Sequence, residues 1–98
     1  MLVRIVKLTF KKENISSFEK LFEQTKQEIR NFDGCNFLEI YQELEKPNVF
    51  FTYSYWENEE VLDEYRNSDF FKSVWSKTKI LFDAKPEAWS VHKRASLS

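Results

Sequence analysis

The sequence predicts an α+β fold of the ferredoxin-like type, a βαββαβ chain that forms a four-stranded antiparallel sheet with two helices on one face. Three observations predict it. Four short runs are rich in β-branched and aromatic residues. Two longer segments repeat apolar residues at three- and four-residue steps. The chain has 98 residues, which supports a single core and no second domain.

The first strand is expected over residues 2–10, where Val6, Leu8 and Phe10 share one face. A helix then begins between Asn14 and Ser16, because Ser16 and Glu19 have the spacing of a capping box and Asn14 is the competing N-cap. Its apolar stripe includes Phe18 and Phe22, and it ends before Gly34, which supplies a left-handed backbone position.

The next two strands are expected to form a hairpin over residues 35–45 and 49–56, joined by a turn at 46–48. Strict alternation in the first of them puts Cys35 and Phe37 on one face and Leu38 and Ile40 on the other.

Asn58 is expected to cap the second helix, which is interrupted at Asn67-Ser68 and restarts at Asp69. The second piece is expected to continue through Leu81 and Phe82, since Pro86 ends helix formation. A last strand over residues 88–93 completes a single domain at 1–94, and residues 95–98 are expected to be a frayed tail.

Composition excludes several classes of function. One glycine cannot build a G-x-G-x-x-G or P-loop phosphate site. One histidine and one cysteine cannot supply a common metal centre, so we expect no metal, haem or flavin. A formal charge of −1 is not that of a nucleic-acid binder, and no apolar run is long enough to span a membrane. With no signal-peptide pattern at the N-terminus, we expect a reduced, cytoplasmic protein.

Apolar side chains occur on both faces of the strand at 49–56, although two helices can cover only one face of the sheet. Val49, Phe51, Tyr53 and Tyr55 point to one side, and Phe50 and Trp56 to the other. We therefore expect a homodimer in which a second copy packs sheet to sheet, and the alternative is a monomer with exposed aromatics.

The segment from Trp56 to Leu62, with Tyr65 and the Ser68-Asp69-Phe70-Phe71-Lys72 run, resembles the antibiotic biosynthesis monooxygenase (ABM) family. The resemblance spans nearly all of residues 1–94 and implies a dimeric α+β barrel. It also implies cofactor-free oxygenation of quinols or polyphenols, in which the substrate's own anion reduces oxygen within a dry aromatic pocket.

A haem-degrading branch of the same family carries an Asn, a Trp and a ligating His at places that fall here on Val6, Tyr65 and Trp75. All three residues differ in this chain, so the resemblance does not imply haem degradation.

Two residues are candidates for catalysis. Tyr65 either hydrogen-bonds a phenolic substrate, or removes its proton, or is a core tyrosine. To act as a base at neutral pH it would need a lowered pKa. His92, the one side chain that ordinarily titrates near neutrality, is either a base or a half-exposed residue of the last strand.

The expected substrate pocket is bounded by a small residue and several aromatic rings. Its residues are Val6, Phe22, Trp56, Phe71 and Trp75. For Trp75 the alternative is plain core, and for Trp56 it is an anchor of the strand-to-helix corner.

Three further side chains bear on reactivity and charge. Cys35 is expected to be a buried, inert thiol. Arg4 or Lys7, on opposite faces of the first strand, offers a positive charge to an anionic substrate or extends to water.

Three functions follow from this sequence. The leading hypothesis is a cofactor-independent monooxygenase acting on a small aromatic, quinol or polyphenol substrate. The second is a non-enzymatic dimeric module that binds a small apolar ligand, and the third is a structural dimer with no pocket.

Overall fold

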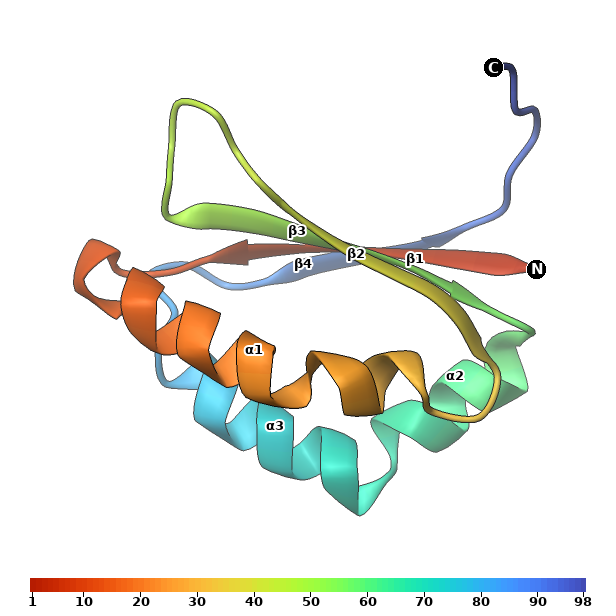
Figure 1. Ribbon diagram of the computed structural model, residues 1–98, viewed down its shortest axis with the longest axis horizontal. Coiled ribbons are helices and arrows are strands. Elements are labelled where there is room, and N and C mark those ends of the chain that lie inside the picture. The colour runs from red at the N-terminus through yellow and green to blue at the C-terminus, as the bar shows by residue number, and fades with distance from the viewer.

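The computed structural model describes residues 1–98 as two layers, one sheet and one set of helices that covers a single face of it (Figure 1). The sheet has four antiparallel strands in the order β2-β3-β1-β4, which confirms the predicted fold class. None of the helices has the length and apolar character that a transmembrane span requires. The elements are β1 (Leu2–Thr9), the 3-10 helix η1 (Lys12–Asn14), α1 (Ile15–Arg30), β2 (Cys35–Gln42), β3 (Val49–Trp56), α2 (Glu59–Arg66), α3 (Asp69–Lys79) and β4 (Glu87–Val91).

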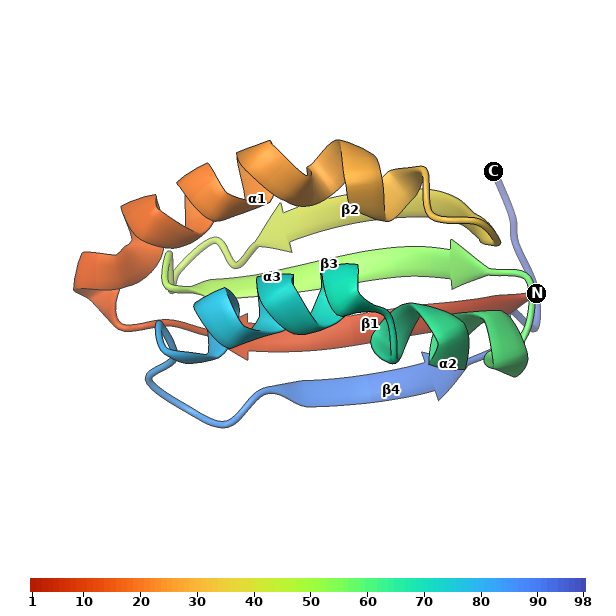
Figure 2. The same ribbon diagram turned by 90° about the horizontal axis from the view of Figure 1, so that it is seen from below.

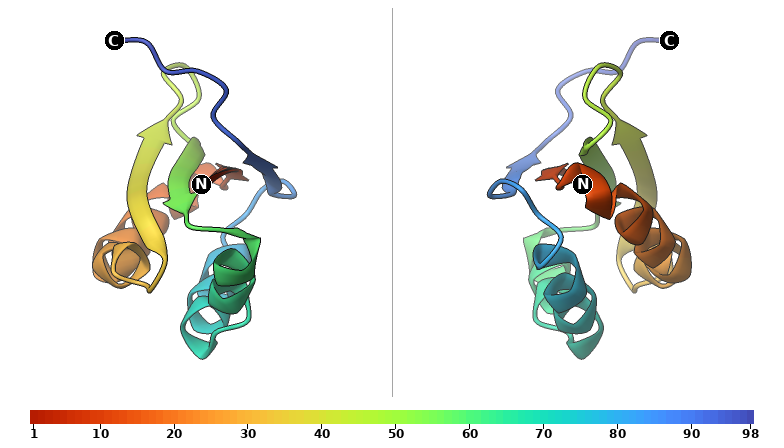
Figure 3. Two further views of the ribbon diagram at one scale, coloured as in Figure 1. Left: turned by 90° about the vertical axis from the view of Figure 1, so that its right-hand side faces the viewer. Right: turned by 90° about the vertical axis from the view of Figure 1, so that its left-hand side faces the viewer.

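The helices run beneath the sheet as two ridges. Seen from the helix side, α1 lies toward the β2 edge, and α2 and α3 follow one another beneath the other half of the sheet (Figure 2). The end views show α1 beside the α2–α3 pair, while the C-terminal segment rises from β4 on the opposite side of the sheet (Figure 3). The two faces of the sheet therefore have different surroundings.

The face toward the helices carries two separate core clusters. One consists of Leu8, Phe10, Phe18 and Phe50. The other consists of Cys35, Trp56, Leu62 and Tyr65. They lie at the two ends of β3, since Phe50 is near its start and Trp56 is its last residue.

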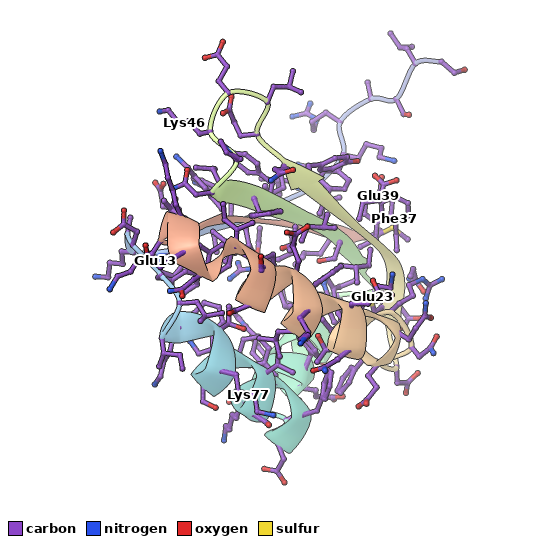
Figure 4. All side chains as sticks on the ribbon, turned by 60° about the vertical axis from the view of Figure 1, so that its left-hand side comes forward. Glu13, Glu23, Phe37, Glu39, Lys46 and Lys77 are labelled. Carbon is purple, nitrogen blue, oxygen red and sulfur yellow. The ribbon has the colours of Figure 1, made fainter.

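The other face, which we call the open face, is rich in aromatic side chains and has no helix over it. The labelled Phe37 and Glu39 lie on the side of β2 away from the helices, and Lys46 lies in the loop that leads to β3 (Figure 4). Phe37 stacks on Tyr55 with ring centroids 4.6 Å apart. The aromatic residues of the open face are Phe37, Tyr41, Phe51, Tyr53, Tyr55 and Trp89.

Gly34 joins α1 to β2 at a place where no other residue fits without strain. Its φ of +92° lies in the left-handed region, as predicted. A Cβ at this position would lie 2.0 Å from Val61 Cγ1, so α2 packs directly on the glycine backbone. The glycine thus brings the two helical ridges together at the end of the sheet.

The start of the first helix differs from the prediction. Neither Asn14 nor Ser16 caps α1, because one 3-10 turn leads directly into it and no side chain bonds its first N–H groups. Asn14 has a near-helical backbone rather than the extended one of an N-cap. Its side chain donates to the Leu81 carbonyl oxygen at 3.2 Å instead.

The predicted side-chain alternation in β2 is wrong at its first residues, and the strand ends at Gln42 rather than at residue 45. Cys35 is paired with Trp56 and Phe37 with Tyr55, so Asn36 is the extra residue of a β-bulge. Cys35 consequently packs in the helix-side cluster, while Phe37 lies on the open face.

The second helix breaks where the sequence predicts. The Asn58 side chain caps α2 by accepting from Val61 N, and Ser68 caps α3 by accepting from Phe71 N. The end of α3 was predicted wrongly, since it stops at Lys79. Phe82 instead forms a β-bridge with Phe10 and stacks on its ring at 5.2 Å. Contact with the end of β1 therefore turns the chain out of the helix.

The last strand lies earlier in the chain than predicted. β4 spans Glu87–Val91, and its pairing with β1 runs from Lys7–Glu87 to Val3–Val91. Because β1 begins at Leu2, almost no partner strand remains beyond Val91. His92 therefore follows the strand rather than belonging to it. Residues 92–98 have no secondary structure and are exposed.

Candidate functional site

A cavity of about 280 Å³ lies between the sheet and the helices. Its walls come from β1, β3 and all three α-helices, with β2 and the region of β4 at its margins. This volume is near the lower end of the range for small-molecule sites, and it suits a ligand of one or two rings.

The cavity exists because a row of short side chains crosses the sheet between the two core clusters. Thr52 pairs with Val6 on one side and Ile40 on the other, and Val6 also pairs with Ala88. Thr52, Val6 and Ala88 have short side chains and all three line the cavity. The large residues of the two clusters hold the layers apart at either end.

Aromatic rings form one wall of the cavity. Phe71 stacks on Trp75 with centroids 5.8 Å apart and planes 11° apart. Tyr65 meets Phe71 edge-on at 5.0 Å and packs against Trp56 at 4.7 Å. Phe22 lines the cavity from α1, across from these rings. The wall is suited to a flat apolar ligand.

Tyr65 is only 7% exposed, and this burial raises its pKa further above the ordinary range of a phenol. The shift is opposite to the one that a general base at neutral pH requires. The Tyr65 carbonyl oxygen accepts a hydrogen bond from Ser68 Oγ at 2.6 Å, but its hydroxyl has no partner in the chain. Because no fully buried side-chain polar atom is left unpaired, this hydroxyl keeps some accessible surface. It can therefore donate to a ligand.

Arg4 brings a positive charge to the cavity, on the face of β1 that also carries Val6. It donates to Ser90 Oγ at 2.9 Å. Burial lowers the pKa of the guanidinium, and nearby Arg66 lowers it further, while Asp63 raises it. Arg66 is ion-paired with Asp63, and Arg4 is in no ion pair.

The cavity is short of groups that transfer protons. None of its 21 lining residues is Asp, Glu, His, Lys or Cys. A second guanidinium, Arg66, also lines the cavity, and most of the remaining polar side chains are hydroxyls, among them Ser54, which accepts a hydrogen bond from Trp56 Nε1 at 2.9 Å. No group of three His, Cys, Asp or Glu residues is close enough to hold a metal ion.

The structure brings most of the predicted site residues together. Val6, Phe22, Trp56, Tyr65, Phe71 and Trp75 all line the one cavity. His92 does not, because it is exposed beyond the end of β4 and borders a separate depression near Met1 and Glu59. The structure therefore gives His92 no contact with the predicted pocket.

Fifteen of the 21 lining residues are not among the predicted site residues, and three of these, Arg4, Thr52 and Ser54, are polar side chains of the sheet. The sequence left the direction of Arg4 open, and it did not single out Ser54 or Thr52. The sequence did carry a signal for Thr52 and Ser54. They lie between Phe50 and Trp56 on the helix-covered face of β3. Polar side chains on a covered face indicate a space that is not filled by core.

Comparison with known proteins gives a family and a fold. Residues 1–75 match the family described as antibiotic biosynthesis monooxygenase. No curated protein matches the sequence. A crystal structure of a conserved protein from Methanosarcina mazei Go1 is 28% identical, with a TM-score of 0.88 over 96% of this chain and 94% of that one.

Two further crystal structures show the same fold at low identity. One is of an antibiotic biosynthesis monooxygenase. It has a TM-score of 0.90 and 16% identity, and the match covers 97% of this chain and 100% of that chain. The other is Rv0793 from Mycobacterium tuberculosis, with a TM-score of 0.88 at 15% identity over 99% and 98% of the two chains.

Proposed function

The chain belongs to the antibiotic biosynthesis monooxygenase family, and from this premise we propose that it is a cofactor-independent monooxygenase acting on a small aromatic, quinol or polyphenol substrate. The observation that carries the proposal is the cavity with its wall of aromatic rings at Tyr65, Phe71 and Trp75. A flat substrate would lie along that wall, above the short side chains of Val6 and Thr52.

The cavity suits an oxygenation in which the substrate supplies its own electrons. The apolar walls favour molecular oxygen and limit the water that would protonate a reactive carbanion, while the open side of the cavity leaves a path to solvent. Tyr65 would orient a substrate oxygen by hydrogen bonding through its open hydroxyl, not by removing a proton, since burial raises its pKa.

Oxygen consumption by the purified protein with a panel of quinols and anthrone-like phenols tests this function. We expect uptake with at least one compound, without added flavin, haem or metal. Val6→Phe fills the space between the sheet and the ring wall and should abolish that uptake. Ile80→Phe places the same ring at a residue 73% exposed outside the cavity and should leave it unchanged. Absence of uptake with every compound, or full activity in Val6→Phe, would contradict the proposal.

A second candidate is a binding module that holds a small apolar ligand without changing it. It is favoured by the absence of any carboxylate or histidine among the lining residues. Ligand binding in the cavity without oxygen consumption would support it. The cavity itself argues against a purely structural dimer with a filled core.

The proposal includes the wider setting expected from the sequence. The functional unit would be a homodimer formed through the open face, with residues 1–94 as its single domain and 95–98 as a frayed tail. It would act in the cytoplasm, without a resident cofactor and without binding nucleic acid. The family match stops at residue 75, and the place of β4 (Glu87–Val91) at the edge of the sheet supports a domain that extends beyond it.

A further inference from the structure

We propose that the cavity takes its aromatic ligand as an anion, with the charged oxygen of the ligand held by the Arg4 guanidinium and the Ser54 hydroxyl. Arg4 and Ser54 are thereby assigned as the residues that would hold the phenolate form of the substrate of the proposed monooxygenase. This assignment rests on that function for the chemistry that follows binding, and on the geometry of one row of residues for the binding itself.

Arg4 and Ser54 are neighbours on the helix side of the sheet. They are paired across β1 and β3, one row beyond the short side chains of Val6 and Thr52. On the other side Arg4 pairs with Ser90 and donates to its hydroxyl at 2.9 Å. A bond to a neutral hydroxyl fixes the guanidinium but leaves its charge uncompensated and its remaining N–H groups free.

The positive charge of Arg4 is not compensated by a neighbouring carboxylate. Arg66 and Asp63, both on α2, form an ion pair and largely neutralise each other. The facing residues of β3 and β4 are the neutral Ser54 and Ser90. Burial and Arg66 both lower the pKa of Arg4, which means that its surroundings disfavour its positive charge. A bound anion would relieve that cost.

Ser54 is positioned to donate to the same anion. Its hydroxyl is buried and accepts from Trp56 Nε1 at 2.9 Å, so one of its lone pairs is already engaged. The hydroxyl hydrogen has no acceptor in the chain and is free to turn toward a ligand. An oxyanion at the end of the cavity would therefore accept from a charged donor and a neutral donor at once.

The protein has no base there to make the anion. The lining holds no carboxylate, imidazole, amine or thiol, and the buried Tyr65 phenol is a weaker acid than usual. The proton of a phenol must therefore pass to solvent water, and the positive charge of Arg4 favours the ionised ligand that remains. Binding through Arg4 would take the place of general-base catalysis at this site.

Titration of 4-nitrophenol in the presence of the protein, under nitrogen, tests the proposal, because the absorbance of this compound reports its ionisation. We expect the wild type to lower the pKa of the bound probe by about one unit, a roughly tenfold preference for the phenolate. Neutral 4-nitrotoluene, of similar size, should bind more weakly than the phenolate. Arg4→Gln should remove the preference for the anion, and Arg4→Lys should keep part of it.

Lys7→Gln is the matched control, since it removes a positive charge from the same strand on the opposite face and should leave the preference intact. Circular dichroism establishes that each variant is folded. Any one of three results would overturn the anion site. These are no binding of 4-nitrophenol, an unchanged pKa of the probe, and an anion preference in Arg4→Gln equal to that of the wild type. Phenolate binding without oxygen uptake from any quinol would sink the proposed monooxygenase and leave the anion site standing. Oxygen uptake from a quinol with no preference for the phenolate would overturn the anion site and leave the proposed monooxygenase standing.

Discussion

Burial changes the chemistry of two ionisable side chains at one end of the cavity. Cys35 and Tyr65 are 4% and 7% exposed and belong to one core cluster with Trp56 and Leu62. In both, burial raises the pKa, because the charged form loses its hydration. Both groups are therefore neutral at physiological pH. Neither group is then a base at neutral pH, and Arg4 lines the cavity without an ion pair.

Tyr65→Phe should lower turnover while changing the free energy of unfolding by less than about 1 kcal/mol, because the hydroxyl that it removes has no partner in the chain. The pH dependence gives a second readout. The folded chain keeps a proton that the unfolded chain loses near pH ~10, so stability should fall as pH rises above that value. Urea unfolding of Tyr65→Phe should lack that part of the fall. A loss of several kcal/mol at neutral pH would mark Tyr65 as core instead.

Cys35 should react slowly with a thiol reagent such as iodoacetamide at pH 8. Its pKa is raised by burial, although a backbone hydrogen bond at Phe37 and the charge of Arg30 partly oppose the shift. Reaction should become complete only when the chain is unfolded, because access and ionisation then both recover. Labelling of the native protein followed by mass spectrometry measures this. Rapid native labelling would show that Cys35 is accessible.

At the scale of elements, short local features decide how the layers meet. A β-bulge at Asn36 turns Cys35 under the sheet, and the close contact of Gly34 with Val61 brings α2 against the start of β2. Ser68 joins α2 to α3 through two bonds, since its hydroxyl donates to Tyr65 O and accepts from Phe71 N. This joint sets the direction in which Tyr65 and Phe71 face the cavity.

Ser68→Ala should destabilise the protein by about 1–2 kcal/mol, because it removes the N-cap of α3 and the bond to α2 together. Ser16→Ala is the matched control. Ser16 is exposed near the start of α1, where no side chain caps the helix, so its loss should change stability by less than about 0.5 kcal/mol. Chemical denaturation of both variants provides the comparison. Equal losses would indicate that Ser16 caps α1 in solution.

At the scale of the whole molecule, the open face is the surface without cover. Tyr41 and Trp89 are 50% and 45% exposed on it, beside the ring pairs of Tyr53 with Phe37 and Tyr55. The C-terminal segment reaches this side, and Lys93 Nζ lies 4.9 Å from the centre of the Tyr55 ring. One lysine covers little of so large an aromatic surface, which fits burial against a second copy.

We expect a dimer in sedimentation at micromolar concentration, with well above about 1,000 Å² buried through the open face. Tyr53→Glu should dissociate it, because the new carboxylate would lie at the centre of an apolar interface. Lys77→Glu, on α3 in the helix layer, changes charge on the far side of the molecule and should leave the dimer intact. A wild type that sediments as a monomer would contradict this interface.

Local sequence patterns determined much of the fold. The alternation of residues 49–56 predicted β3 to the residue, Asn58 marked the start of α2, and the interruption at Asn67-Ser68 marked the break before α3. These features depend on contacts within a few residues, which propensity and capping rules describe. The periodicity of the strands and helices likewise placed Val6, Phe22, Tyr65, Phe71 and Trp75 on inward faces, and these line the cavity.

The tertiary structure alone decided features that depend on distant partners. Phe82 leaves the helical pattern to stack on Phe10, Asn14 turns from the helix to Leu81, and β4 ends where β1 offers no further partner, so that His92 stays outside. The same holds for the charge of the site. Arg4 becomes the free cation of the cavity because Asp63 pairs with Arg66, and whether a charge is compensated depends on side chains brought together by folding, not on its place in the chain.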